Sequence, residues 1–439
     1  MKLTRILITA VLLLYVFNAY SEQCKIKPLA DDCKVLYRTA DPKNIYIYDP
    51  AVAVCPNGRI IGCFSLGGSK AGTVKPPKGD GNAYIYTSDD DGETWDYRWT
   101  FPMWHFRPFV AGDKLYILGH KSDLKVISSD DWGDTWSEVT DLTKGQTWHG
   151  SATNVWYKDK YVYLVMERRM GGDMTRGWKV AELAPVLMRG DVNKDLTKRE
   201  NWTFSSEMAF HDVVNDKELD WFGVPFYEGY YPDGKRNVRG RTSFNPMGWL
   251  EANVVQIKDP KHFWYDPEGK TFHIFMRAHT GLTNIGCMIK AVEQKDGTIK
   301  TMLEKAPSGK THLFMPFPGG QMKFSVVYDE QTKLYWLLNT QATDSMTRPE
   351  LLPDDRYALS DNERRRLVLH FSKNMVDWCF AGVVSIGPEE YASRHYAQMV
   401  IKGDDLLIMS RSGDKEAKDA HNGNIATFHK VENFRDLVY

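Results

Sequence analysis

Ionisable and polar side chains stand at or near the first residues of several β-rich runs that are far apart along the chain. Carboxylates, imidazoles and phenols can transfer protons or attack a substrate, whereas guanidinium, ammonium and amide groups can hold an anion. The residues at these positions are Asp49, Arg107, His149, Glu251, Gln321, Lys323, Arg394, His395 and Tyr396. They can act together only in a fold that gathers the starts of these runs in one place.

Two stretches of eight residues share one turn pattern. Residues 88–95 (SDDDGETW) and 129–136 (SDDWGDTW) both read S-x-D-x-G-x-T-W, and both follow a β-rich run. The Ser hydroxyl and Asp carboxylate can bond to amides of a hairpin turn, Gly supplies a positive φ, and Trp packs beneath. The pattern resembles the Asp box of sialidases and related β-propellers. In that family the boxes lie on the outside of the blades, away from the active site.

With the two boxes as markers, alternation of apolar and polar residues predicts an all-β, six-bladed propeller. The blades begin near Ala51, Arg107, His149, Trp249, Met322 and Tyr396. The last blade is one strand short, and residues 33–38 are expected to supply that strand and close the ring, which removes exposed edges. A Gly-, Tyr- and Arg-rich insert at 221–247 follows the third blade, and the count becomes seven if this insert contains another blade.

The N-terminus is typical of a secretory signal. Lys2 and Arg5 precede an apolar stretch at 6–16, and Ala19-Tyr20-Ser21 is a small-x-small cleavage site. The apolar stretch is short for a membrane span, so no stable membrane insertion is expected. We therefore expect a signal peptide at 1–21 and one exported domain at 22–439, secreted or periplasmic.

Export permits disulfides, and two of the cysteine pairs are close in sequence. Cys24 lies near Cys33, and Cys55 and Cys63 flank a Pro-Asn-Gly turn, so that the second pair could join neighbouring strands. Small buried thiols are the alternative.

Composition narrows the class further. The chain has 439 residues with 42% hydrophobic and 26% charged residues, which is enough to bury a core and excludes a disordered protein. Its 56 Lys+Arg against 57 Asp+Glu give no electrostatic reason to expect nucleic acid. Neither zinc nor EF-hand spacing is present, so no metal or cofactor is expected. The 14 Trp and 22 Tyr suit both a β core and a glycan partner. The oligomeric state is left open.

Three positions resemble catalytic positions of sialidases. Glu251 resembles the catalytic Glu of that family, Arg277 the arginine that follows it, and Tyr396 the nucleophilic Tyr. This resemblance implies that Glu251 accepts the proton of Tyr396, since a phenol with a pKa near 10 is a poor nucleophile otherwise. Asp80, in the glycine-rich loop at 78–82, lies where the family keeps its general acid, and an ordinary turn explains it equally well.

Two positions depart from the sialidase pattern. Asp49 stands where the first of three carboxylate-binding arginines is expected, and Gln321 and Lys323 stand in place of another. Lys does not reproduce the planar bidentate clamp of Arg, and Arg107 and Arg394 do not fall in the family's positions. The sequence therefore predicts little activity on ordinary sialosides.

Three functional hypotheses remain. The first is an exo-acting glycoside hydrolase with changed specificity, for an acidic or complex glycan. The second is a propeller-type polysaccharide lyase for uronic-acid glycans, in which a His or Tyr base removes the proton α to the carboxylate. Its candidates are His105, His149, His279, His395, Arg107 and Arg394. The third is a non-catalytic glycan-binding propeller. A lyase product absorbs ultraviolet light through a new C=C bond, a hydrolase product shows only a reducing end, and a lectin forms neither.

Overall fold

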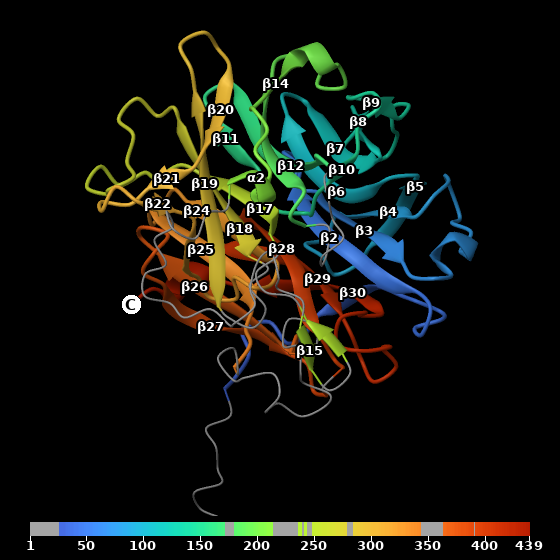
Figure 1. Ribbon diagram of the computed structural model, residues 1–439. Coiled ribbons are helices and arrows are strands. Elements are labelled where there is room, and N and C mark those ends of the chain that lie inside the picture. Colours follow the sequence, from blue (N-terminus) through green and yellow to red (C-terminus); the bar gives the residue numbers. More distant parts are fainter. Residues whose placement is uncertain are drawn as a thin grey trace, which may run out of the picture.

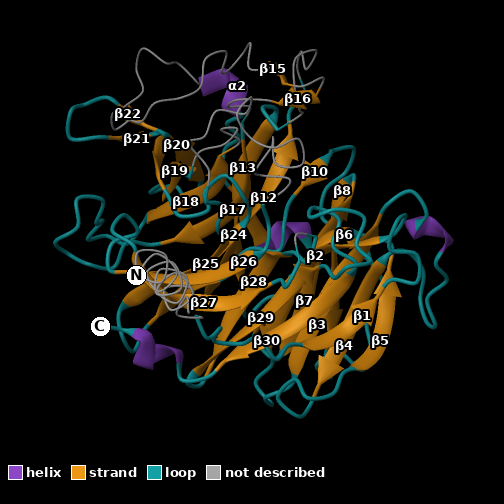
Figure 2. Ribbon diagram, turned by 90° about the horizontal axis from the view of Figure 1, so that it is seen from below, coloured by secondary structure: helices purple, strands orange, loops and turns teal. Residues whose placement is uncertain are grey.

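Short alternating runs separated by tight turns form six antiparallel sheets that follow one another around a common centre (Figure 1). The computed structural model describes residues 26–171, 180–213, 236–238, 241–243, 248–278, 284–343, 363–389 and 391–439. Most of the 221–247 insert and His279 lie outside these residues. Figure 2 shows that strands dominate the described regular structure, with a few short helical segments.

The first three blades follow the chain in order from inner to outer strand. Blade 1 contains β2 (Tyr46–Val54), β3 (Ile60–Gly67), β4 (Ala83–Ser88) and β5 (Asp96–Phe101). Blade 2 contains β6 (Trp104–Ala111), β7 (Lys114–Lys121), β8 (Asp123–Ser129) and β9 (Thr140–Asp141). Blade 3 has a divided inner strand, β10 (Trp148–His149) and β11 (Trp156–Lys158), followed by β12 (Tyr161–Arg169), β13 (Leu183–Asp191) and β14 (Trp202–Phe204).

The other three blades complete the ring. Blade 4 contains β17 (Trp249–Val255), β18 (Thr271–Ala278), β19 (Ile285–Glu293) and β20 (Ile299–Met302), with β23 (Phe314–Pro316) also paired to β19. Blade 5 contains β24 (Phe324–Asp329), β25 (Leu334–Thr340), β26 (Arg366–Ser372) and β27 (Cys379–Ile386). Blade 6 contains β28 (Arg394–Lys402), β29 (Asp405–Ser412) and β30 (Ile425–Val431). The smaller elements among the described residues are β15 (Arg236–Val238), β16 (Arg241–Ser243), β21 (Glu304–Lys305), β22 (Thr311–His312), α2 (Phe210–Val213) and three short 3-10 helices (Ala71–Thr73, Arg199–Asn201 and Phe434–Leu437).

An N-terminal strand closes the ring, as predicted. β1 (Lys34–Arg38) pairs antiparallel with β30, with Lys34 opposite Phe428 and Arg38 opposite Ile425. The inner strands β2 and β28 also contact each other, so blade 6 meets blade 1. The outer edge of blade 6 is therefore paired with the beginning of the described chain.

The two predicted Asp boxes form the turns between the third and fourth strands of blades 1 and 2. In the first box the Ser88 hydroxyl contacts Asp90 at 2.8 Å and accepts the Gly92 N–H, while Asp90 accepts the N–H and hydroxyl of Thr94. Gly92 has φ +89°, as expected, and the Trp95 ring packs edge-on against Phe428 of blade 6. Each box therefore stabilises a turn at the outside of a blade.

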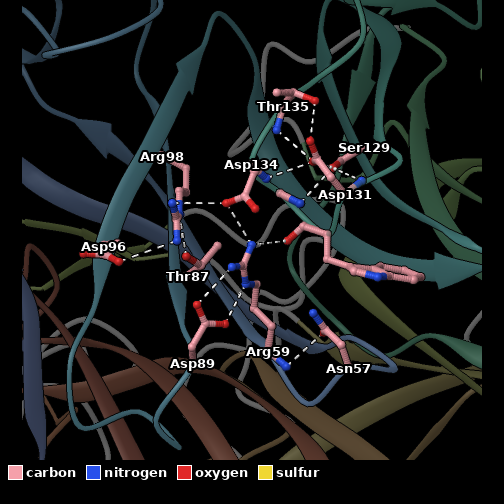
Figure 3. A network of polar contacts seen from close by, with 12 residues as sticks. Asn57, Arg59, Thr87, Asp89, Asp96, Arg98, Ser129, Asp131, Asp134 and Thr135 are labelled. Atoms are coloured by element: carbon pink, nitrogen blue, oxygen red, sulfur yellow. Dashed lines mark hydrogen bonds and ion pairs between the residues drawn. The ribbon is translucent and has the colours of Figure 1, made fainter.

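The second box also joins two blades electrostatically (Figure 3). Arg59 of blade 1 contacts both oxygens of Asp89, at 2.7 and 2.9 Å, and its Nη1 lies 2.9 Å from Asp134 of blade 2. Arg98 reaches the same Asp134 oxygen at 3.1 Å. This network is structural and lies at the Asp boxes rather than at the inner strands.

A third, degenerate box lies at the same turn of blade 5, where the sequence pattern did not reveal it. The Ser372 hydroxyl accepts the Met375 N–H at 2.9 Å, and Asn374 replaces the usual Asp as acceptor of the Val376 and Asp377 amides. Met375 has φ +63°, the conformation that Asp91 and Trp132 adopt in the complete boxes. One deleted residue and the Asn hide the pattern.

Of the two alternatives for Cys55 and Cys63, the structure has the buried free thiols and not the disulfide. Cys63 is paired with Ala51, and Cys55 lies four positions farther along the chain than Ala51. At about 3.3 Å per residue this separation is too large for a disulfide. Both thiols are buried and free; Cys287 is also buried and free, and Cys33 and Cys379 are free and partly buried. Cys24 lies outside the described residues.

The core lies between neighbouring blades. Buried apolar side chains of blades 1 and 2 form one cluster, and those of blades 5 and 6 form another. The longest cluster joins blades 3, 4 and 5. In the described ranges, no helix is long and apolar enough to cross a membrane. Because packing fixes each blade against its neighbours, the starts of the inner strands are held in fixed relative positions.

Candidate active site

Four inner strands begin with the same backbone device. The register shifts between Tyr48 and Ala51 in β2, Trp104 and Arg107 in β6, Leu250 and Asn253 in β17, and His395 and Gln398 in β28. Each shift contains one residue with positive φ: Asp49 at 41°, His105 at 55°, Glu251 at 63° and Tyr396 at 48°. A β-bulge re-aims a side chain out of the strand alternation, and left-handed non-glycine residues are found at functional sites more often than elsewhere. All four residues are candidates of the sequence analysis, His105 under the lyase hypothesis alone.

Arg277 connects the predicted base, Glu251, and the predicted nucleophile, Tyr396. Its Nη1 lies 3.6 Å from Glu251 Oε1 and donates to the Tyr396 hydroxyl at 3.3 Å, while its Nε donates to the Gln321 carbonyl at 2.7 Å. Glu251 is 3% exposed, and its Oε2 has no hydrogen-bond partner among the described residues. Burial raises the pKa of Glu251; Arg277 opposes this shift, and the neighbouring Asp49 and Glu167 add to it. The three residues that resemble sialidase positions are therefore brought together.

Lys323 holds the bulge that carries Tyr396. Its Nζ donates to the main-chain carbonyls of Tyr396 and Ala397, at 2.9 and 3.0 Å. The side chain is buried, and this burial lowers its pKa to about 8 against the opposing charges of Asp49 and Glu251. Lys323 thus supports the backbone of the bulge that carries Tyr396, and its predicted role in substrate binding stays a prediction.

Two further arginines surround Tyr396, and sequence reasoning missed both. The guanidinium carbons of Arg364 and Arg411 lie 5.2 and 5.1 Å from the centre of the Tyr396 ring. Arg411 is 1% exposed and also lies 4.9 Å from the ring of Tyr46. Its Nη2 donates to Asn422 at 3.3 Å, but Nε and Nη1 have no hydrogen-bond partner in the described part of the chain. Arginines 277, 364 and 411 thus gather at one phenol.

A rule of antiparallel geometry would have found one of these two arginines, Arg411, and two other residues that the sequence prediction missed. The end of a blade's second strand lies beside the start of its first, so that His395 pairs with Arg411 and Leu250 with Arg277. In the same way His149 pairs with Glu167, and Trp104 with His120. The sequence prediction considered mainly the starts of inner strands, and it therefore missed Arg411, Glu167 and His120.

An acid and two imidazoles form a buried chain between blades 1 and 2. His105 Nε2 lies 2.9 Å from Asp49 Oδ2, and His105 Nδ1 lies 2.6 Å from His120 Nε2. Ser151 donates to the other Asp49 oxygen at 2.9 Å. Burial opposes ionisation of Asp49, but His105, Lys323 and Ser151 outweigh it and lower its pKa to about 2. Burial also lowers the pKa of His105 and His120, which opposes their protonation, and the low pKa of Asp49 favours its ionised form.

His149 forms a separate dyad in blade 3. Its Nδ1 lies 2.6 Å from Glu167 Oε2, and Glu167 Oε1 accepts the main-chain N–H of Ala252, the residue after Glu251, at 3.0 Å. Burial opposes ionisation of Glu167, but the contacts with His149 and Ala252 outweigh it and lower its pKa. The His149 side chain is 16% exposed, whereas His105 and His395 are buried.

Arg107 and Arg394 are occupied by protein groups. Arg107 is buried and donates to the carbonyls of Val165, at 2.6 Å, and Ser151. Arg394 donates to the carbonyls of Ser393 and Gly413, at 2.8 and 3.0 Å. Their predicted role in substrate binding stays a prediction, and the observed contacts are those of residues that tie neighbouring segments together.

The remaining predicted residues, Asp80, His395 and Gln321, lie in three different surroundings. The Asp80 side chain is exposed, accepts the N–H of Gly81, and lines a hollow with Trp99 and Trp136. Among the described residues no contact joins Asp80 to Glu251 or Tyr396. His395 Nδ1 lies 2.7 Å from Arg364, and the side-chain amide of Gln321 is buried with no partner in the described ranges.

Comparison with solved structures agrees with this architecture. A protein of unknown function from Dyadobacter fermentans matches at a TM-score of 0.54 with 13% identity, covering 93% of this chain and 99% of that one. The Hadza microbial sialidase Hz136 matches at 0.52 with 13% identity, covering 91% and 68%. Trypanosoma rangeli sialidase with 2,3-difluorosialic acid matches at 0.51 with 12% identity, covering 94% and 60%. No family model and no curated protein matches the chain. The chain has the sialidase-like six-bladed propeller fold, and structural neighbours with this fold include glycoside hydrolases.

Proposed function

We propose that the protein is a glycoside hydrolase that acts on a glycan carrying an anionic sugar, with Tyr396 as nucleophile and Glu251 as its base. The observation that carries this proposal is the position of Arg277, whose Nη1 contacts both the Glu251 carboxylate and the Tyr396 hydroxyl. A nucleophile and its base must lie within reach of each other, and a shared cation stabilises the phenolate that forms.

The electrostatics of the pair suit proton transfer. Burial raises the pKa of Glu251. A carboxylate with a higher pKa is a stronger base, and Glu251 is therefore a better acceptor for the proton of a phenol. The phenolate oxygen of Tyr396 attacks the anomeric carbon, the bond to the leaving-group oxygen breaks, and that oxygen keeps the electron pair of the bond and takes a proton from a general acid. Water then attacks the same carbon and gives a proton back to that general acid, while Tyr396 leaves and recovers its own proton from Glu251.

The arginines support an anionic substrate. Arg277, Arg364 and Arg411 gather at Tyr396, and Arg411 keeps two guanidinium nitrogens without partners among the described residues. A guanidinium group binds a carboxylate or sulfate through parallel N–H donors. The ionised Asp49 lies in the same centre, in the position where sialidases carry an arginine, so we expect an anionic sugar other than an ordinary sialoside.

The test combines product analysis with trapping of the nucleophile. Purified protein is incubated with a panel of uronic-acid, sulfated and neutral oligosaccharides and their aryl glycosides, and the products are examined by NMR and ultraviolet absorption. With an active aryl glycoside found, its 2-fluoro analogue is expected to label Tyr396, as peptide mass spectrometry would show, and Tyr396→Phe is expected to remain unlabelled. Unsaturated products would favour the lyase hypothesis instead, and binding without turnover would favour the lectin.

A further inference from the structure

We propose that His149, oriented by Glu167, donates the proton to the leaving-group oxygen. This inference rests on the proposed hydrolase function and adds a catalytic residue to it. The proton donor expected from the sequence was Asp80, but its exposed carboxylate is bonded within its own loop and lies beside the outer strand β5.

The geometry fixes which nitrogen of His149 faces a substrate. Glu167 Oε2 lies 2.6 Å from Nδ1, so Nδ1 carries a proton and donates it to the carboxylate. Glu167 is held by the Ala252 N–H at its other oxygen, and its side chain is 1% exposed. No hydrogen bond engages Nε2 of His149 within the described part of the chain. Nε2 is therefore the nitrogen that is free to exchange a proton with a ligand.

The position of His149 in the ring suits a proton donor. His149 begins blade 3 and Tyr396 begins blade 6, and in a ring of six blades in chain order these two are opposite each other. Displacement at the anomeric carbon requires the leaving group to depart on the side away from the nucleophile. A substrate attacked by Tyr396 therefore directs its leaving-group oxygen toward the half of the ring that contains His149.

The proton balance is complete with these groups. Protonated His149 gives its Nε2 proton to the glycosidic oxygen as the bond from that oxygen to the anomeric carbon breaks. The neutral imidazole then takes a proton from the attacking water, which restores its charge. Among the described residues, the titratable groups that face His149 from packed elements include Glu167 on β12, His105 on β6, whose ring centre lies 4.8 Å away, and His120 on β7. Glu167 acts as a positioning residue through His149.

The experiment compares leaving groups of different basicity. We would measure kcat/KM of wild type and His149→Ala for one sugar attached either to 2,4-dinitrophenol or to a second sugar. A poor leaving group needs the acid, whereas dinitrophenolate departs without it. His149→Ala is expected to lose about a hundredfold or more on the disaccharide and less than about tenfold on the dinitrophenyl glycoside. Added imidazole is expected to restore part of the disaccharide activity.

Matched variants separate this inference from the proposed function. Tyr396→Phe is expected to lose activity on both substrates, and His211→Ala, a partly exposed histidine on α2, is expected to lose it on neither. Glu167→Gln is expected to shift the basic limb of the pH–rate profile, which a purely structural role would not do. Equal losses of His149→Ala on both substrates, or no loss on either, with an unchanged melting temperature, would overturn the role of His149 alone. Full activity of Tyr396→Phe, or an unsaturated product, would overturn the proposed function.

Discussion

Arg277 donates a hydrogen bond to the hydroxyl of Tyr396 at 3.3 Å, although 119 residues separate the two along the chain. The contact joins the end of β18 in blade 4 to the bulge of β28 in blade 6, and it places the same guanidinium group beside Glu251. A cation at this position stabilises negative charge on the phenolic oxygen, which is the charge that develops as Tyr396 loses its proton.

Tyr396 and Glu251 are expected to act as one unit. Tyr396→Phe keeps the ring on which Arg364 and Arg411 pack, and Glu251→Gln keeps the shape of the side chain, so both variants should fold. Each is expected to lower kcat by about two orders of magnitude or more, and the double variant should lose little beyond the worse single variant. Steady-state kinetics of the three proteins check this, and simple multiplication of the two losses would contradict it.

The pH dependence of activity should reflect the ionisation of the Glu251 carboxyl group. The carboxyl must be ionised to accept the Tyr396 proton, so activity falls as pH drops through its pKa, which burial raises above 4.5. We expect the acid limb of kcat/KM above pH 4.5. At neutral pH, Glu251→Gln should be at least as stable as wild type, because a raised pKa means that the buried charge opposes folding. An acid limb at or below pH 4.5 in a folded protein would exclude Glu251 as the base.

Asp49 should stabilise the fold through its charge. Its folded-state pKa of about 2 lies below the ordinary 3.8, so its stabilisation is fully present above pH 3.8 and is lost as pH falls through 2. Asp49→Asn is expected to lower the free energy of unfolding by about 2 kcal/mol at pH 7, with a smaller difference near pH 3. Urea unfolding across this range measures it, with the exposed Asp80→Asn as control. A difference that stays constant down to pH 3 would contradict the assignment.

Alanine substitutions at two glycines with the same φ distinguish the cost of backbone strain from the cost of a steric clash. Gly58 and Gly92 both have φ +89°, but a Cβ on Gly58 meets nothing within 4 Å, whereas one on Gly92 comes within 2.1 Å of the Phe428 ring. Gly58→Ala is expected to lower the free energy of unfolding by about 1–2 kcal/mol. Gly92→Ala is expected to lower the free energy of unfolding clearly more, because the added Cβ would displace Phe428 of blade 6. Equal melting temperatures for the two variants would show that the Asp box does not press against blade 6.

Arg411 should select for the charge of the substrate. Arg411→Gln keeps a polar side chain but removes the cation and the paired N–H donors, so KM for an anionic glycoside is expected to rise more than about tenfold. The uncharged carboxamide analogue should be affected much less. The ratio of kcat/KM for the two substrates measures this selectivity, and Arg59→Gln, at the outer Asp boxes, serves as the control. An unchanged ratio in Arg411→Gln would remove this residue from substrate recognition.

The sequence predicted the fold further than the site. The two Asp boxes and the period-two alternation predicted six blades and the closing strand because both are local patterns. Glu251 and Tyr396 were predicted by resemblance at blade starts, but the bulges that re-aim them depend on register, which a single strand does not reveal. Arg364, Arg411 and Glu167 were missed because they enter from second and third strands. Asp80 was placed by resemblance to the general-acid position of sialidases; it lies in an exposed loop beside β5, and its role as a proton donor stays a prediction.

The pairing of β1 with β30 also bears on how the chain reaches its native state. The partners Lys34 and Phe428 are almost the whole chain apart. Blades 1 to 5 can assemble one after another as synthesis proceeds, but the sixth sheet has to wait for the last strands and for the return of the first. Bringing together strands that are so far apart along the chain costs conformational entropy, and this cost makes the closing step slow. Until then the edges of β1 and β30 are unpaired, so the nearly finished ring is the species most exposed to aggregation. The final step of folding is thus also the step that protects the protein.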